Sequence, residues 1–228
     1  VATALAAHEG GLYLDGLEKL DAATAESLAA HRGELSLGGL TDIPPEAAKR
    51  LARHQGDLFL NGLERVTAAT CEAFQGFHDG LFLDGLRELP LDVAKPLAAR
   101  EGYLSLDALT ELKPEGAEEL ARHQGPISLS GLVTIPDAVA ERIAAHVGSL
   151  YLDGLTMLEP PVAAVLARHK GDLSLLGVTS LSREAAAAFA AHEGGLLLDG
   201  LPTLDPTAAQ SIAACRGDLS LEIGRAHV

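Results

Sequence analysis

Several residue types that usually reveal a protein's chemistry are scarce in this sequence. Its 228 residues include two cysteines, one methionine, no tryptophan, three tyrosines and five phenylalanines. Two cysteines cannot build a disulfide framework, which indicates either a reducing compartment or a lineage that does not rely on disulfides, and the compartment stays open. No apolar run approaches the roughly 18 to 20 consecutive residues that a membrane-spanning helix needs, so we expect no transmembrane segment.

Positive charge is also in short supply. Lys and Arg number 17 against 32 Asp and Glu, which gives a formal net charge of −15 at pH 7. This is the wrong sign for phosphate backbones and anionic lipid surfaces, so we expect no nucleic-acid partner. Hydrophobic residues make up 47% of the chain, which is enough for a continuous core.

Motifs of the common catalytic and cofactor sites are missing as well. The chain has no Gly-x-Ser-x-Gly elbow, no phosphate-binding loop ending in Gly-Lys, no His-Glu-x-x-His and no Cys-x-x-Cys. We therefore expect no catalytic residue, no cofactor and no enzymatic activity.

The chain instead carries a 23-residue repeat without insertion or deletion. Each copy contains a Leu-x-Leu phrase, followed in most copies by a glycine, an aliphatic residue and an Ala-x-x-Leu pair. The phrase begins at Leu12, Leu35, Leu58, Leu81, Leu104, Ile127, Leu150, Leu173, Leu196 and Leu219. A fixed period of this kind is the signature of a solenoid, in which each repeat packs on its neighbours. Cys71 and Cys215 fall six repeats apart, out of disulfide range.

Each repeat predicts one strand and one helix. The Leu-x-Leu phrase alternates apolar and mixed residues, as a short strand does, whereas Ala25 and Leu28 have the spacing of one helix face. Helix N-caps are expected at Asp21, Thr67, Ser182 and Asp205, and prolines at the next position are Pro45, Pro114, Pro160 and Pro206. Glycines that follow the helices, from Gly33 to Gly194, are expected in the left-handed conformation.

The pattern resembles the leucine-rich repeat, and most closely its cysteine-containing class. In residues 35–52 a Leu-x-Leu-x-x-Leu-x-x-Ile phrase precedes a helix ending in Leu-Ala, and Leu40 stands where that class has cysteine. The resemblance implies an α/β fold: a right-handed horseshoe solenoid with a parallel β-sheet on the concave face and short α-helices on the convex face. Strands stack about 4.8 Å apart and helices about 8 to 10 Å apart, so the stack should bend with the sheet inside.

The domain organisation follows from the repeat boundaries. We expect residues 1–222 to form a single solenoid of about ten repeats and residues 223–228 to form a non-repeat tail. The chain begins with Val1 in the middle of a repeat and lacks a charged-then-apolar leader, so we expect it to be a piece of a longer protein.

A histidine column is the first candidate for chemistry. Its members are His8, His31, His54, His123, His146, His169 and His192, while Phe77, Arg100 and Cys215 take the same place in three other repeats. We expect a structural column in the last helical turn, where a ring N–H meets an unpaired carbonyl and a positive charge meets the helix dipole. Weak metal binding is the alternative, although we assign no metal ligand.

The concave sheet face is the better candidate, because its outward residues vary between repeats and mix aromatic, hydroxyl and acidic side chains. The predicted protein-binding residues are Tyr13, Asp15, Phe59, Asn61, Phe82, Asp84, Tyr103, Asp107, Tyr151 and Asp153. Phe59 and Phe82, on adjacent repeats, are the expected centre of the interface. An aspartate at this place can alternatively form an Asx turn with the glycine that follows it.

The sequence thus predicts a non-enzymatic repeat scaffold for protein–protein interaction, with a protein partner of basic or mixed character. Two alternatives stay open. One is a structural spacer array that associates end to end, and the other is weak metal binding by the histidine column.

Overall fold

The computed structural model describes residues 1–223, in which short helices and short strands alternate. The helices are α1 (Ala2–Leu5), α2 (Ala22–Leu28), α3 (Pro45–Leu51), α4 (Ala68–Ala73), α5 (Leu91–Ala98), α6 (Pro114–Leu120), α7 (Asp137–Ile143), α8 (Pro160–Leu166), α9 (Arg183–Phe189) and α10 (Pro206–Ile212). The strands are β1 (Leu12–Tyr13), β2 (Leu35–Ser36), β3 (Leu58–Phe59), β4 (Leu81–Phe82), β5 (Leu104–Ser105), β6 (Ile127–Ser128), β7 (Leu150–Tyr151), β8 (Leu173–Ser174), β9 (Leu196–Leu197) and β10 (Leu219–Ser220).

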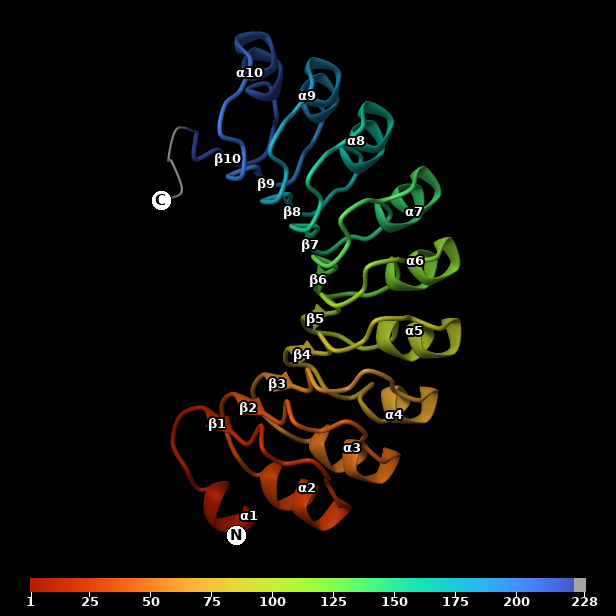
Figure 1. Ribbon diagram of the computed structural model, residues 1–228, viewed down its shortest axis with the longest axis vertical. Helices are drawn as coiled ribbons and strands as arrows, with labels where there is room; N and C mark the ends of the chain where they lie inside the picture. Colours follow the sequence, from red (N-terminus) through yellow and green to blue (C-terminus); the bar gives the residue numbers. More distant parts are fainter. Residues whose placement is uncertain (224–228) are drawn as a thin grey trace.

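The strands form one parallel sheet in sequence order, from β1 to β10. Each strand residue lies opposite the residue 23 positions later, as Leu12 lies opposite Leu35 and Leu196 opposite Leu219. Figure 1 shows the result as an arc with the strands along its inner edge and the helices outside. The predicted α/β solenoid, with a parallel sheet on the concave face and helices on the convex face, is therefore confirmed. The bend has the direction expected from strands that stack more closely than helices.

Local sequence signals explain where the helices begin. The four predicted caps are all present, because the side chains of Asp21, Thr67, Ser182 and Asp205 accept hydrogen bonds from backbone N–H groups two or three residues later. Pro45, Pro114, Pro160 and Pro206 are each the first residue of their helix, where a missing N–H costs nothing. Most helices are seven residues long, about two turns.

The core is a set of aliphatic columns between the sheet and the helices. Both leucines of the Leu-x-Leu phrase are buried from β2 to β9, as are the Ala-x-x-Leu pairs of the helices, such as Ala48 and Leu51. No repeat could bury these residues alone, since each apolar face is covered by the next repeat. The register of the sheet is therefore fixed by the core as well as by the backbone.

The glycines that follow the helices differ from expectation. Gly33, Gly56 and Gly102 have the predicted positive φ, but the later members from Gly125 to Gly194 do not. At these later glycines the backbone lies close to that of the preceding repeat. A Cβ on Gly171, for example, would overlap the carbonyl of Gly148. Glycine is needed at this place for backbone approach between repeats, and only in some repeats for its left-handed conformation.

Two further expectations concern the ends and the membrane. Ile223, the first residue of the expected tail, is exposed, and residues 224–228 lie outside the described residues. In the part of the chain that the structure describes, no helix is long and apolar enough to cross a bilayer.

Candidate functional site on the concave sheet face

Three residues of each repeat point away from the core at the inner edge of the arc. They are the residue before the strand, the second strand residue and the second residue after the strand, and we call these positions over ten repeats the concave columns. All ten predicted binding residues belong to them. Tyr103 takes the first position, Tyr13, Phe59, Phe82 and Tyr151 take the second, and Asp15, Asn61, Asp84, Asp107 and Asp153 take the third.

Four of the five aromatic residues meet in a continuous row, the aromatic strip, made of Phe59, Phe82, Tyr103 and Tyr151. The rings of Phe59 and Phe82 stack with centroids 4.1 Å apart and an interplanar angle of 17°. Tyr103 lies 5.2 Å from Phe82 on one side and 6.1 Å from Tyr151 on the other. All four side chains are half-buried, so the strip is packed on the sheet and still reaches solvent.

Tyr103 makes the aromatic strip continuous, because the second-column residues between Phe82 and Tyr151 are the small residues Ser105 and Ser128. It precedes β5, yet its ring reaches Tyr151 on β7, so it must cross β6, whose outward residue is Ser128. Burial raises the pKa of the Tyr103 phenol above its ordinary value, so this ring is uncharged at neutral pH.

Tyr13 does not join the strip. It lies on β1 with 62% of its surface exposed, and Ser36 of β2 stands between it and Phe59. Its hydroxyl donates a hydrogen bond of 2.6 Å to the carboxylate of Glu34, and this bond raises the pKa of Tyr13. The structure therefore separates Tyr13 from the other predicted aromatic residues.

The aspartates of the third column have partners that the sequence reading did not foresee. Instead of forming a local Asx turn, Asp107 accepts a hydrogen bond of 2.5 Å from the Ser128 hydroxyl and one of 2.7 Å from the backbone N–H of Ser130. Both donors belong to the next repeat. The same aspartate–serine bond, here called a rung, joins Asp15 to Ser36, Asp84 to Ser105, Asp153 to Ser174, and Asp199 to Ser220.

The rungs also explain the sequence variation on this face. Every aspartate in the third column is followed, in the next repeat, by a serine in the second column. Where the third column holds another residue, the next second-column residue is large and apolar; these pairs are Gly38 with Phe59, Asn61 with Phe82, Ser130 with Tyr151, and Leu176 with Leu197. A junction between repeats thus holds either a rung or a large side chain in the second column. At two junctions without a rung, Asn61 and Ser130 still accept hydrogen bonds of 3.3 Å from the backbone N–H groups of Asp84 and Asp153. This pairing is readable in the sequence, but only by comparing neighbouring repeats.

The histidine column is a buried stack. His31, His54, His123, His146, His169 and His192 are at most 4% exposed, whereas His8, at the end of the array, is exposed. Neighbouring rings lie nearly parallel with centroids 5.9 to 6.5 Å apart. The rings follow the helices rather than lying in the last helical turn. Nε2 of His192 lies 3.3 Å from the carbonyl oxygen of Gly195, three residues later. His54 and His123 each approach a glycine carbonyl of the preceding repeat at 2.8 Å, those of Gly33 and Gly102.

The expected favourable positive charge in this column is wrong. Burial lowers the pKa of His54, His123 and His169, and it lowers that of His146 from 6.5 to about 4. These four rings are therefore neutral at pH 7. In the described residues both ring nitrogens of His146 are buried without a hydrogen bond, although the carbonyls of Gly125 and Ala121 lie near them.

Other residue types fill the column by packing in the same space. Phe77 is buried, and the guanidinium of Arg100 lies 5.7 Å from its ring. Arg100 donates to the carbonyls of Asp79 and Tyr103 at 2.5 and 2.9 Å, while burial lowers its pKa to about 10. Cys215 is half-buried. The position thus accepts side chains of different chemistry, and Arg100 is the one of these three that donates to two carbonyls at less than 3 Å.

No metal centre is formed by these side chains. Among residues 1–223, no group of three or more His, Cys, Asp or Glu side chains is placed to hold an ion. Cys71 and Cys215 are both unpaired, and burial raises the pKa of Cys71 to about 12. A thiol with this pKa is protonated at neutral pH and is a poor nucleophile.

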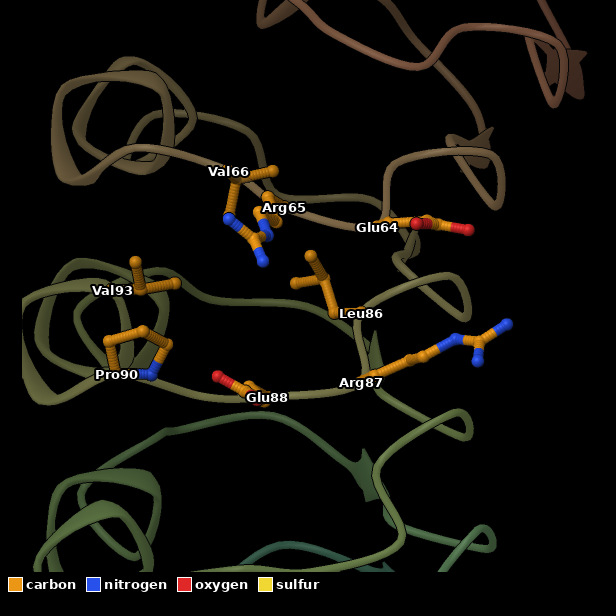
Figure 2. A pocket seen from close by; sticks show the side chains of 8 residues that line it. All are labelled: Glu64, Arg65, Val66, Leu86, Arg87, Glu88, Pro90 and Val93. Atoms are coloured by element: carbon orange, nitrogen blue, oxygen red, sulfur yellow. The ribbon is translucent and has the colours of Figure 1, made fainter.

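A pocket of about 340 Å³ lies away from the concave face, between the strand-to-helix segments of the third and fourth repeats. Val66, Leu86 and Val93 form its apolar wall; Val66 is the one valine in a column of leucines and isoleucines, which leaves space there. Figure 2 shows Arg65 turned into the space between the two segments, while Glu64 and Arg87 point away from it. Its mixed charges favour no ligand class.

Comparisons with known proteins give a structural likeness only. No family model and no curated protein matches the chain. Among solved structures, an internalin from Listeria monocytogenes matches over 91% of this chain and 72% of its own, with a TM-score of 0.40 and 14% sequence identity. The fold assignment rests on the strand order and register described above.

Proposed function

We propose that this solenoid is a non-enzymatic scaffold that binds a protein partner through its concave sheet face. The observation that carries the proposal is the aromatic strip. Large aromatic side chains in mutual contact are the usual anchors of protein interfaces, and they are otherwise rare in this chain. The proposed contact residues are the strip itself with Asn61, Asp84, Asp107 and Asp153 along its edge.

The rest of the face supports this arrangement. Polar rungs join β4 to β5 and β5 to β6 beneath the middle of the strip, and a surface held in this way loses little freedom on binding. Asp15 and Tyr13 lie further toward the N-terminal end and form the outer part of the proposed surface. The placement within the cysteine-containing class of leucine-rich repeats stays a prediction.

The test is a differential capture experiment on an extract of the source cells. The wild-type chain is compared with the double variant Phe59→Ala with Phe82→Ala, and with Val133→Ala with Met157→Ala as the control. The control residues are also apolar and exposed, but they lie on the strand-to-helix segments outside the concave columns. We expect partners that bind the wild type and the control equally and are lost from the phenylalanine variant.

Two results would contradict the proposal. One is a set of partners unaffected by the phenylalanine substitutions. The other is a large loss of thermal stability in the phenylalanine variant, which would mean that these rings belong to the core. Light scattering over a concentration series checks the alternative of end-to-end association, which predicts a growing mass in all three proteins.

A further inference from the structure

The charge of the concave columns is entirely of one sign. They contain ten acidic residues and no Lys, Arg or His, although the chain as a whole has 17 Lys and Arg and nine His. The acidic members are Asp15, Glu34, Asp57, Asp84, Asp107, Asp153, Asp172, Asp199, Asp218 and Glu222. Basic residues are thus confined to the helices and the flanking segments.

The carboxylates beside the aromatic strip lack a cationic partner. Elsewhere, acidic residues pair with arginines, as Glu26 pairs with Arg50 and Arg53 at 3.0 Å. Within the described residues, Asp84, Asp107 and Asp153 form no ion pair and instead accept hydrogen bonds from serine hydroxyls and backbone N–H groups. Those bonds fix the carboxylates in place without neutralising them, so the row attracts positive charge.

The strip and the acidic row run side by side across the same strands. Phe59 lies on β3 and Tyr151 on β7, so the strip crosses four strand spacings, about 19 Å at about 4.8 Å each. An extended peptide covers that length with about six residues. The carboxylates lie two residues further along each strand, about 7 Å away, which a lysine or arginine side chain can reach from a backbone above the rings.

We propose that the occupant of this face is an extended peptide segment rich in Lys and Arg, lying along the aromatic strip with its cations toward Asp84, Asp107 and Asp153. This rests on the proposed function and names its partner class. Aromatic faces attract guanidinium and ammonium groups, so the strip and the row favour the same ligand. A second copy of this chain is a poor occupant, because it would bring the same negative charge to the face.

The probe is a displayed library of random linear dodecapeptides selected on the wild-type chain, followed by calorimetry with synthetic copies of the enriched peptides. Asp84→Asn with Asp107→Asn removes two charges and keeps the oxygen that accepts from serine. Phe59→Leu with Phe82→Leu removes the aromatic faces and keeps apolar bulk, and leucine is already present at this position as Leu197. Glu141→Gln with Glu184→Gln removes the same charge from exposed places on α7 and α9 and is the control.

We expect enriched peptides to carry an excess of Lys and Arg. Their dissociation constants should rise at least tenfold for the asparagine variant and for the leucine variant, and less than twofold for the control. Circular dichroism should show all four proteins folded. Affinity should also weaken as salt is raised from 50 to 300 mM, because the attraction is electrostatic.

Each other outcome is decisive. Peptides without excess Lys and Arg, or binding weakened by only one of the two concave variants, would overturn the cationic peptide on the aromatic strip and leave the concave interface standing. Binding unchanged in both concave variants would overturn both proposals. If no peptide is enriched, or if the chain itself dimerises through the strip, the inference is wrong, and the capture experiment above still judges the proposed function.

Discussion

His146 offers a sharp test of the energetics of the buried stack. Its ring is 1% exposed and lies between those of His123 and His169, at 6.3 and 6.0 Å. Burial is the largest cause of its lowered pKa, and repulsion from the neighbouring imidazoles adds to it when they are charged. Phe77 fills the same place in another repeat, so His146→Phe should remove the titrating group and preserve the packing.

The sign of the effect follows from the two pKa values. Above pH 6.5 the ring is neutral in both the folded and the unfolded chain. Below pH 6.5 the ring binds a proton in the unfolded chain, whereas in the folded chain it stays neutral down to about pH 4. The free energy of unfolding therefore falls as the pH falls. For this one group the loss is about 2 kcal/mol at pH 5 and about 3 kcal/mol at pH 4.

The assay is the free energy of unfolding by urea at pH 7, 5 and 4. The carboxylates titrate in both proteins, so the difference between His146→Phe and wild type isolates the ring. Relative to wild type, the free energy of unfolding of His146→Phe should rise by about 2 kcal/mol at pH 5 and about 3 kcal/mol at pH 4. His8→Phe makes the same exchange at the exposed end of the column and should follow the wild type. Parallel curves for wild type and His146→Phe, within about 0.5 kcal/mol, would refute the reasoning.

Three further substitutions test the contacts between repeats by the same urea measurement. Asp107→Ala should lower the free energy of unfolding by about 2 kcal/mol because it removes the oxygen that accepts from the Ser128 hydroxyl and from the N–H of Ser130. Asp107→Asn should cost clearly less, and equal losses would contradict the rung. Gly102→Ala should lower the free energy of unfolding by about 2 kcal/mol or more, since φ is +80° and a Cβ would meet the carbonyl of His78. Gly76→Ala, where a Cβ would lie in open space, should be neutral or stabilising. Arg100→Ala should lose about 3 kcal/mol through a cavity and lost carbonyl partners, and Arg100→His, the common residue of the column, should recover part of it.

The sequence predicted the architecture because its signals act within one repeat or at a fixed offset. Leu35 and Leu58 lie opposite each other because they hold the same place in consecutive repeats. Asp21 caps α2 through an N–H three residues away, a contact short enough to be read from local pattern. These features need no knowledge of how the repeats approach one another.

Features that depend on the approach of one repeat to the next were harder to predict. The stacking that requires Gly171 involves a carbonyl 23 residues earlier, and a column of glycines looks the same whether φ or close contact selects it. The charge predicted for the histidines was wrong for a similar reason. How deeply His146 is buried depends on the rings of His123 and His169 in the two adjacent repeats. The aspartate–serine bond joins residues 21 apart, so columns compared one at a time hide it.

The aromatic strip shows the same limit at the candidate site. Phe59 and Phe82 were expected to be neighbours because they occupy one column in adjacent repeats. The contact of Tyr103 with Tyr151 was not expected, because it joins different columns across a strand with a small residue. The hydrogen bond of Tyr13 to Glu34 was equally hidden, since it joins a strand residue to the segment before the next strand.

The rungs have a consequence for building or shortening arrays of this type. Because Asp84 belongs to one 23-residue unit and Ser105 to the next, a cassette cut just before its strand carries half of two different pairs. If such a cassette were moved to another junction, its serine could follow Gly38, or its phenylalanine could face an aspartate. One side chain at each splice would then lack its partner. A cassette cut between the third and fourth residues of the phrase, such as Leu83 and Asp84, would keep both members together and could be inserted at any junction.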